Sequence, residues 1–217
     1  MPAESSVGLS SVHTRANICE TPHYSKPPTV RHNIMTTQQL STDLKEILEK
    51  ETTQTFLKSA RQFIEIVEND KIDKEKFYNI AHTTLIDLYA AGHKLEIIDL
   101  KYSSSDSNFE DPSDNIFKAK NIELMSSLGQ DCFYWEVFDP TYNKENKPTQ
   151  GWLVDDFSDI YRDLKTELNK IDNITTDEAV EDALWQLRFG FYHHWGNHCI
   201  NAIRALHYLW YDGKQAM

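Results

Sequence analysis

Apolar side chains recur every three or four residues over most of the chain beyond residue 40, and this is the period of an amphipathic helix. The pattern predicts five helices, over residues 41–69, 74–97, 114–128, 152–171 and 176–211. Asp73 and Ser113 stand at the starts of two of them, where short polar side chains cap free backbone N–H groups. Thr175 and Glu178 have the spacing of a capping box at the start of the last helix.

The last of these stretches is long for one helix, because an unbroken helix over residues 176–211 would exceed about 50 Å. Gly190 and Gly196 within it predict a bend or the close approach of another helix. The segment DCFYWEVFDP, residues 131–140, fits neither the helical nor the strand period, so a short strand, a helical turn and an ordered aromatic plug all remain open. The whole pattern predicts an all-α fold, a compact bundle of about five helices with one short irregular aromatic segment.

The beginning of the chain has a different composition. Residues 1–34 are rich in Ser, Thr, Pro and His and show neither period, so we expect a disordered or loosely ordered N-terminal extension. Residues 35–217 are then predicted to form a single helical domain. Polar loops are expected within that domain over residues 101–115 and 141–150.

The charge of the chain excludes some classes of function. With 34 acidic and 22 basic residues its formal net charge is −12 at pH 7, which opposes binding to nucleic acid, because phosphates require clustered Lys and Arg. No apolar run approaches the ~18–20 residues of a membrane helix, so no membrane association is expected. The three cysteines have no CxxC spacing, which predicts free thiols in a reducing compartment and a cytoplasmic protein.

Four aspartates gather near the start of the helix predicted over residues 152–171. On a helical wheel the apolar face leaves Asp155 and Asp159 pointing away from it, while Asp156 and Asp163 lie at its edge. Asp156 and Asp163 could therefore face a cleft, or the cluster could form a solvated face near the helix N-terminus.

Four histidines lie in the last predicted helix. His194 and His198 fall on its apolar stripe one turn apart, whereas His193 and His207 point to the opposite half. Two interpretations stay open for the first pair. They are imidazoles hydrogen-bonded within a core, or they are ligands of a divalent metal that takes Asp156 or Asp163 as its third ligand. The HExxH and ExxH motifs of known metal sites are absent.

The overlapping segment RFGFYH has the arginine–histidine spacing of HEPN ribonucleases, in which the two side chains act on RNA at a dimer interface. This alternative makes Arg188 and His193 catalytic candidates and favours a homodimer. The negative net charge argues against an RNA substrate.

The stretches WLVDDFSDIYRDLK and RFGFYHHWGNHCINAIRALH, with YWEVFDP upstream, resemble the bacterial family of uncharacterised proteins known as domain of unknown function 5063. The resemblance covers about residues 50–210. It implies a compact helical domain and implies no activity.

These observations favour an interaction module or a small-ligand-binding module over an enzyme, with a protein or a small molecule as partner. The predicted ligand-binding side chains are those of His194, Trp195, His198, Asp156, Asp163 and Tyr161. No cofactor is predicted. The alternative with a divalent metal uses His194, His198 and Asp156 as ligands. The corresponding enzyme is a metal-dependent hydrolase that uses His194, His198 and Asp156 or Asp163.

Overall fold

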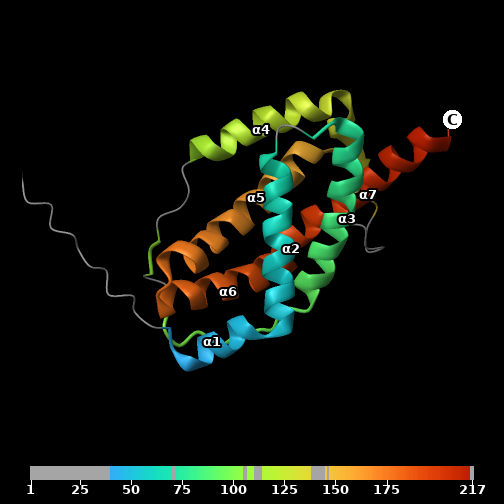
Figure 1. The fold of residues 1–217 in the computed structure, drawn as a ribbon. Coiled ribbons are helices and arrows are strands. Elements are labelled where there is room, and N and C mark those ends of the chain that lie inside the picture. The colour runs from blue at the N-terminus through green and yellow to red at the C-terminus, as the bar shows by residue number, and fades with distance from the viewer. Residues whose placement is uncertain are drawn as a thin grey trace, which may run out of the picture. The chain divides into compact units, whose positions relative to one another are not determined.

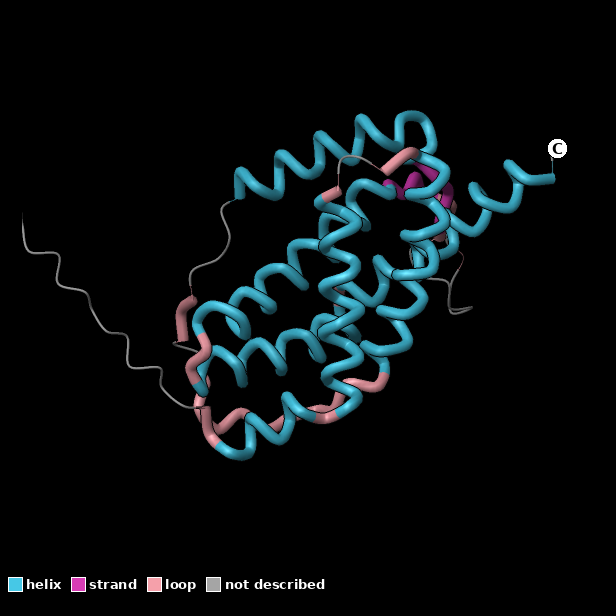
Figure 2. The backbone as a smooth tube through the Cα atoms, in the orientation of Figure 1, coloured by secondary structure: helices cyan, strands magenta, loops and turns pink. Residues whose placement is uncertain are grey.

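A computed structural model describes residues 40–69, 72–104, 107–109, 114–137, 145 and 147–215. These residues form seven α-helices, two short helical turns and one two-stranded ribbon, which confirms the all-α class (Figures 1 and 2). In chain order the elements are α1 (Thr42–Glu49), α2 (Glu51–Glu68), α3 (Lys74–His93), α4 (Asp114–Leu128), η1 (Gly129–Cys132), β1 (Phe133–Glu136), β2 (Thr149–Trp152), α5 (Leu153–Asn169), η2 (Lys170–Ile174), α6 (Asp177–His193) and α7 (Trp195–Gln215).

The helix count exceeds the predicted five because two of the predicted helices are interrupted. Lys50 has an extended backbone, with ψ at 138°, and divides the first into α1 and α2. His194 divides the last into α6 and α7, near the two glycines that predicted a bend. The start of α4 follows the prediction, although Ser113 itself lies outside the described residues.

The cap of α6 lies one residue later than predicted. Thr176 is the N-cap, and its side-chain oxygen accepts a hydrogen bond from the backbone N–H of Ala179 at 3.2 Å. Thr175 instead has a left-handed backbone, with φ at 53°, where η2 ends. The predicted capping box of Thr175 and Glu178 is therefore wrong.

The predicted aromatic segment becomes a turn of 3₁₀ helix followed by strand β1. This strand pairs antiparallel with β2, whose first two residues were predicted as the end of a polar loop and whose last residue was predicted as the start of a helix, and Tyr134 stands opposite Gly151. A Cβ atom on Gly151 would lie 2.4 Å from the Tyr134 ring, so a side chain there would displace the ring. Because β2 runs directly into α5, the ribbon is joined to the first turn of that helix.

Helix α5 is the centre of the packing, since it contacts α2, α4, α6 and α7. Figure 1 shows it between α4 and α6. Its apolar face is fully buried and is anchored by Phe157, whose ring lies 5.7 Å from Phe63 and 5.5 Å from Phe77. Such aromatic contacts add to the free energy gained by burying the rings.

All described elements belong to one compact unit, Thr37–Met217. The N-terminal extension predicted over residues 1–34 lies outside the described residues and stays a prediction. Among the described helices none has the length and apolar character that crossing a bilayer requires. Cys132 and Cys199 are both buried free thiols.

A buried glutamate ties the segment after α3 to helix α6. The carboxylate of Glu181 accepts backbone N–H bonds from Lys101, Tyr102 and Ser103 at 2.7–2.8 Å, and also the Ser103 hydroxyl. Burial opposes its ionisation, but these hydrogen bonds outweigh burial and hold the pKa of Glu181 below its ordinary value.

We expect Glu181→Gln to lower the free energy of unfolding at pH 7 by about 2 kcal/mol, because a neutral amide accepts these bonds less strongly than a carboxylate. A lowered pKa stabilises the fold above the ordinary value of 4.5, and this stabilisation is lost as the pH falls towards the lowered value. Urea unfolding at pH 7 and pH 3 should show the difference between the two proteins shrinking at pH 3. The exposed Glu65→Gln should show no difference at either pH.

Candidate metal centre

Three aspartates of α5 share one face of that helix. Asp156, Asp159 and Asp163 are spaced i, i+3 and i+7, which places them within about 60° of one another around the helix axis. All three are bonded or close to histidines from the junction of α6 and α7. Asp155 and Asp159 were both expected to point away from the apolar face, and of these two Asp159 lies close to the histidines.

The junction places His194 outside the regular helices. Its backbone has φ at −146° and ψ at −89°, its N–H still donates to the Gly190 carbonyl, and its own carbonyl accepts the N–H of Asn197. A Cβ atom on Gly196 would lie 2.0 Å from the Phe191 carbonyl oxygen, so only glycine permits this close approach. The imidazole of His194 is 47% exposed and does not face the core as the wheel predicted.

Trp195 and Tyr161 belong to the core rather than to an accessible site. Trp195 is fully buried, and its indole N–H donates to the Leu187 carbonyl at 3.1 Å across the break. The Tyr161 hydroxyl donates to Glu68 on α2, and Tyr161 lies nearly opposite Asp159 around α5. Both polar atoms are already used, so we assign neither residue to the ligand site for which it was predicted.

His198 is held by a buried carboxylate. Its Nδ1 lies 2.8 Å from Asp156 Oδ1, while Asp156 Oδ2 accepts the Tyr134 hydroxyl at 2.6 Å. Burial raises the pKa of Asp156 although both bonds oppose this, and the pKa of His198 is raised because Asp156 outweighs the effect of burial. A carboxylate at Nδ1 favours the tautomer with a proton there, which leaves the Nε2 lone pair of the neutral ring free.

His194 is held in the same way from the other end of the aspartate row. Its Nδ1 lies 2.7 Å from Asp163 Oδ2. Burial raises the pKa of Asp163, and the bond to His194 opposes this rise. Each imidazole thus has its own carboxylate at Nδ1, so that both Nε2 atoms are left for other partners.

The two Nε2 atoms converge on the middle aspartate. Asp159 Oδ2 lies 3.5 Å from His198 Nε2 and 4.0 Å from His194 Nε2, and one atom from each residue fits within a 4.8 Å group. Two ligands of a tetrahedral zinc ion, each at about 2.05 Å, are about 3.3 Å apart. A small closing movement of the exposed His194 would therefore complete a three-ligand site.

Asp159, rather than Asp156, has an oxygen available to the two Nε2 atoms. Both oxygens of Asp156 are engaged, and only 3% of its surface is exposed. The other oxygen of Asp159 is paired with Arg162 Nη1 at 3.2 Å, which leaves Oδ2 directed to the histidines. Asp156 and Asp163 are thus the carboxylates that orient the two imidazole rings.

The structure does not join Arg188 to His193. Arg188 donates to the Tyr192 hydroxyl and lies over the Tyr192 ring, whereas His193 packs on Phe189 at 4.4 Å between ring centres. No bond between Arg188 and His193 is present among the contacts of the described residues, and their catalytic role stays a prediction.

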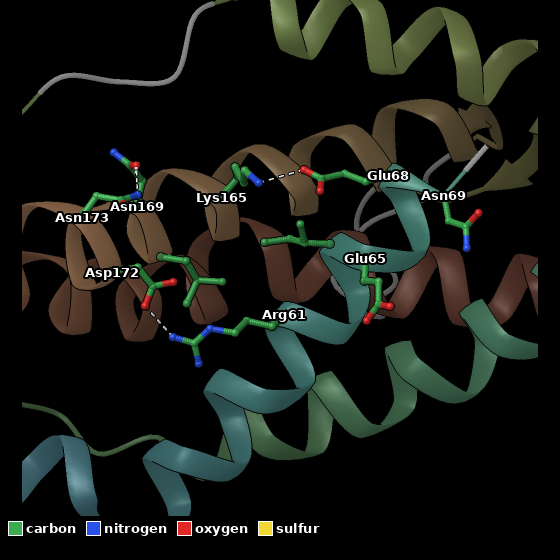
Figure 3. A pocket seen from close by; sticks show the side chains of 10 residues that line it. Arg61, Glu65, Glu68, Asn69, Lys165, Asn169, Asp172 and Asn173 are labelled. Carbon is green, nitrogen blue, oxygen red and sulfur yellow. Dashed lines mark hydrogen bonds and ion pairs between the residues drawn. The ribbon is translucent and has the colours of Figure 1, made fainter. Parts of the chain in front are cut away.

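Two cavities bear on where a small molecule could enter. One of about 390 Å³ lies between α5 and α6 and is bordered by Asp163 and His194, so it adjoins the candidate centre. Another, of about 640 Å³, lies between α2 and α5 (Figure 3). Its walls are joined by the ion pairs Arg61–Asp172 and Lys165–Glu68, and it contains no predicted site residue.

The fold and this site define an all-α protein in which a row of aspartates on helix α5 faces two histidines at the break between helices α6 and α7. The chain belongs to the family described as domain of unknown function DUF5063, whose model matches residues 46–212, and this confirms the resemblance seen in the sequence. A solved structure, protein BF1032 from Bacteroides fragilis, is similar in fold, with a TM-score of 0.63 and 21% identity, covering 75% of this chain and 94% of that chain. No curated protein matches the sequence.

The close approach at Gly196 makes a prediction about the break that presents His194. Gly196→Ala should lower the free energy of unfolding by about 3 kcal/mol, because the added methyl group meets a backbone carbonyl that cannot rotate away. Thermal or urea unfolding checks this. Asn197→Ala, at the exposed next position, should change the same quantity by less than about 0.5 kcal/mol.

Proposed function

We propose that the protein binds a divalent transition-metal ion, such as Zn²⁺, through Asp159 Oδ2, His194 Nε2 and His198 Nε2. The observation that carries this proposal is the convergence of two imidazole Nε2 atoms on one carboxylate while each Nδ1 atom has a carboxylate of its own. Metal-binding histidines nearly always donate the second ring N–H in this manner.

The donor set also limits the kind of ion. Two imidazole nitrogens and one carboxylate oxygen suit Zn²⁺, Fe²⁺, Co²⁺ or Ni²⁺, whereas Mg²⁺ and Ca²⁺ prefer oxygen ligands throughout. The site is therefore distinct from the magnesium sites that clustered aspartates form on their own.

The charges of the side chains around the site favour the binding of a cation. Among the described residues, carboxylates outnumber basic side chains around the site. The carboxylates are those of Glu136, Asp155, Asp156, Asp159, Asp163, Glu167 and Asp182, and the basic side chains are Arg162, Lys170 and Arg204. Lys170 is already shared by Glu167 and Asp182 at 2.8 and 2.7 Å. A bound divalent ion would offset the remaining negative charge.

This function places the protein in the small-ligand-binding class expected from its sequence, with a metal ion as the ligand. The binding of a protein partner, homodimer formation and a cytoplasmic location remain predictions. Buried free thiols at Cys132 and Cys199 are consistent with the reducing compartment expected for such a location.

The full chain, prepared without a histidine tag, should hold one Zn²⁺ or Co²⁺ per molecule. His198→Ala should weaken that binding by about 100-fold or more, because it removes a ligand. Competition against a chromophoric chelator gives the affinity, and elemental analysis gives the stoichiometry. The thermal stabilisation by added metal should fall in parallel.

His193→Ala is the matched control, because His193 is an exposed imidazole five positions away that is not part of the cluster. It should bind metal as the unaltered chain does. Absence of stoichiometric metal in the unaltered chain, or equal binding by the His198→Ala variant, would contradict the proposal.

A metal-dependent hydrolase is the second candidate function, and the number of protein ligands favours it. Catalytic zinc sites have three protein ligands and an open position for water, whereas structural sites have four. The side chain of His194 is 47% exposed and borders the cavity of about 390 Å³, so the open side is reachable. The protein itself would supply orientation through Asp156 and Asp163.

We expect the zinc-loaded chain, if it has this second function, to hydrolyse nitrophenyl esters or phosphates at a rate at least ten times that of the metal-free chain. His198→Ala should lose the difference. Equal rates with and without metal over a panel of such substrates would contradict the hydrolase function, but they would not contradict metal binding.

A further inference from the structure

Tyr134 lies outside the candidate ligand set but is bonded to Asp156, the carboxylate that holds one of the two histidines. It belongs to strand β1, and its hydroxyl donates to Asp156 Oδ2 at 2.6 Å. The other oxygen of Asp156 holds His198 at 2.8 Å. One chain of hydrogen bonds therefore runs from the ribbon, through a buried carboxylate, to one of the two imidazoles.

The ribbon fixes the place of the Tyr134 ring. Successive side chains of β1 point to opposite faces, so that Phe133 and Trp135 are exposed while Tyr134 is half-buried. Gly151, its cross-strand partner, carries no side chain that would displace the ring. On the other face the rings of Phe133 and Trp152 stack at 6.5 Å, which holds the two strands in register.

The phenol is the donor in its bond to the Asp156 carboxylate. Burial and the charge of Asp156 raise the pKa of Tyr134 well above its ordinary value, so the hydroxyl stays protonated. A carboxylate that accepts this bond with Oδ2 has its plane fixed, and it then presents Oδ1 to His198. An unfixed carboxylate could turn and offer either oxygen at a range of angles.

The other histidine has no corresponding support. Among the described side chains only His194 hydrogen-bonds to Asp163, and Asp163 is 28% exposed. The two halves of the cluster thus differ, because His198 is held by a buried and doubly bonded carboxylate whereas His194 is held by a more open one.

We propose that Tyr134 is a positioning residue of the metal centre, which orients Asp156 so that His198 directs Nε2 towards Asp159. This inference rests on the proposed metal binding. Tyr134 touches neither the ion nor any of its three ligands, and it acts through Asp156 alone.

The test compares Tyr134→Phe with Tyr161→Phe. Both remove one hydroxyl bonded to a carboxylate and keep the ring, but Tyr161 donates to Glu68 on α2. Tyr134→Phe should weaken binding of Co²⁺ and Zn²⁺ by about 10- to 100-fold and change the visible absorption spectrum of bound Co²⁺. Tyr161→Phe should leave the affinity within about twofold and the spectrum unchanged.

A double-mutant cycle with Asp156→Asn separates positioning from general loosening of the fold. If Tyr134 acts through Asp156, Tyr134→Phe should have no further effect on affinity once Asp156 is Asn. An equal loss in both backgrounds would overturn the inference. Should Tyr134→Phe not fold, Gly151→Ala replaces it, because the added methyl group would displace the Tyr134 ring. Weaker Co²⁺ binding by this variant supports the inference, and unchanged affinity overturns it.

The outcomes for the two proposals are distinct. No metal binding by the unaltered chain removes the proposed function and the role of Tyr134 with it. Metal binding by the unaltered chain with the same affinity and Co²⁺ spectrum in Tyr134→Phe removes the role of Tyr134 alone.

Discussion

The break between α6 and α7 at His194 is the constraint on which the arrangement of the candidate centre depends. Asp156 and Asp163 are seven residues apart on α5, about 10 Å along the helix, and the rings of His194 and His198 lie 4.9 Å apart between their centres. His194 has a non-helical backbone at the break. Each Nδ1 meets its own aspartate, and Asp159 is left between the two rings.

Helix α5 combines two kinds of face that are usually kept apart. One carries Phe157 and its apolar neighbours into the core, and the other carries the aspartates against α6 and α7. A carboxylate that is 97% buried, as Asp156 is, would be strongly destabilising without partners. Its hydrogen bonds with Tyr134 and His198 offset that cost. The ribbon and the histidine therefore stabilise α5 as well as shaping the candidate site.

The sequence predicted the fold class and the family. It left open a bend or a close approach at Gly190 and Gly196, and a contact of the histidine pair with the aspartate edge was one of two interpretations. It missed Asp159, although the i, i+3, i+7 spacing contained the signal, because the wheel was centred on the apolar face alone. It missed Tyr134 because a ribbon pairing across the stretch from residue 133 to 152 leaves no periodic trace. It assigned Trp195 to a ligand site because the neighbouring residues are histidines. The burial of its indole depends instead on packing against helices distant in the sequence, such as α2.

The bond from the Trp195 indole to the Leu187 carbonyl has a consequence for how an ion would be received. The bond ties the first residue after the break back to α6, six residues before that helix ends. The same indole ring lies within 6 Å of the rings of Phe56 and Phe191 in the core. The corner that carries the histidines is therefore preorganised, and an arriving ion would spend little of its binding free energy on ordering the backbone.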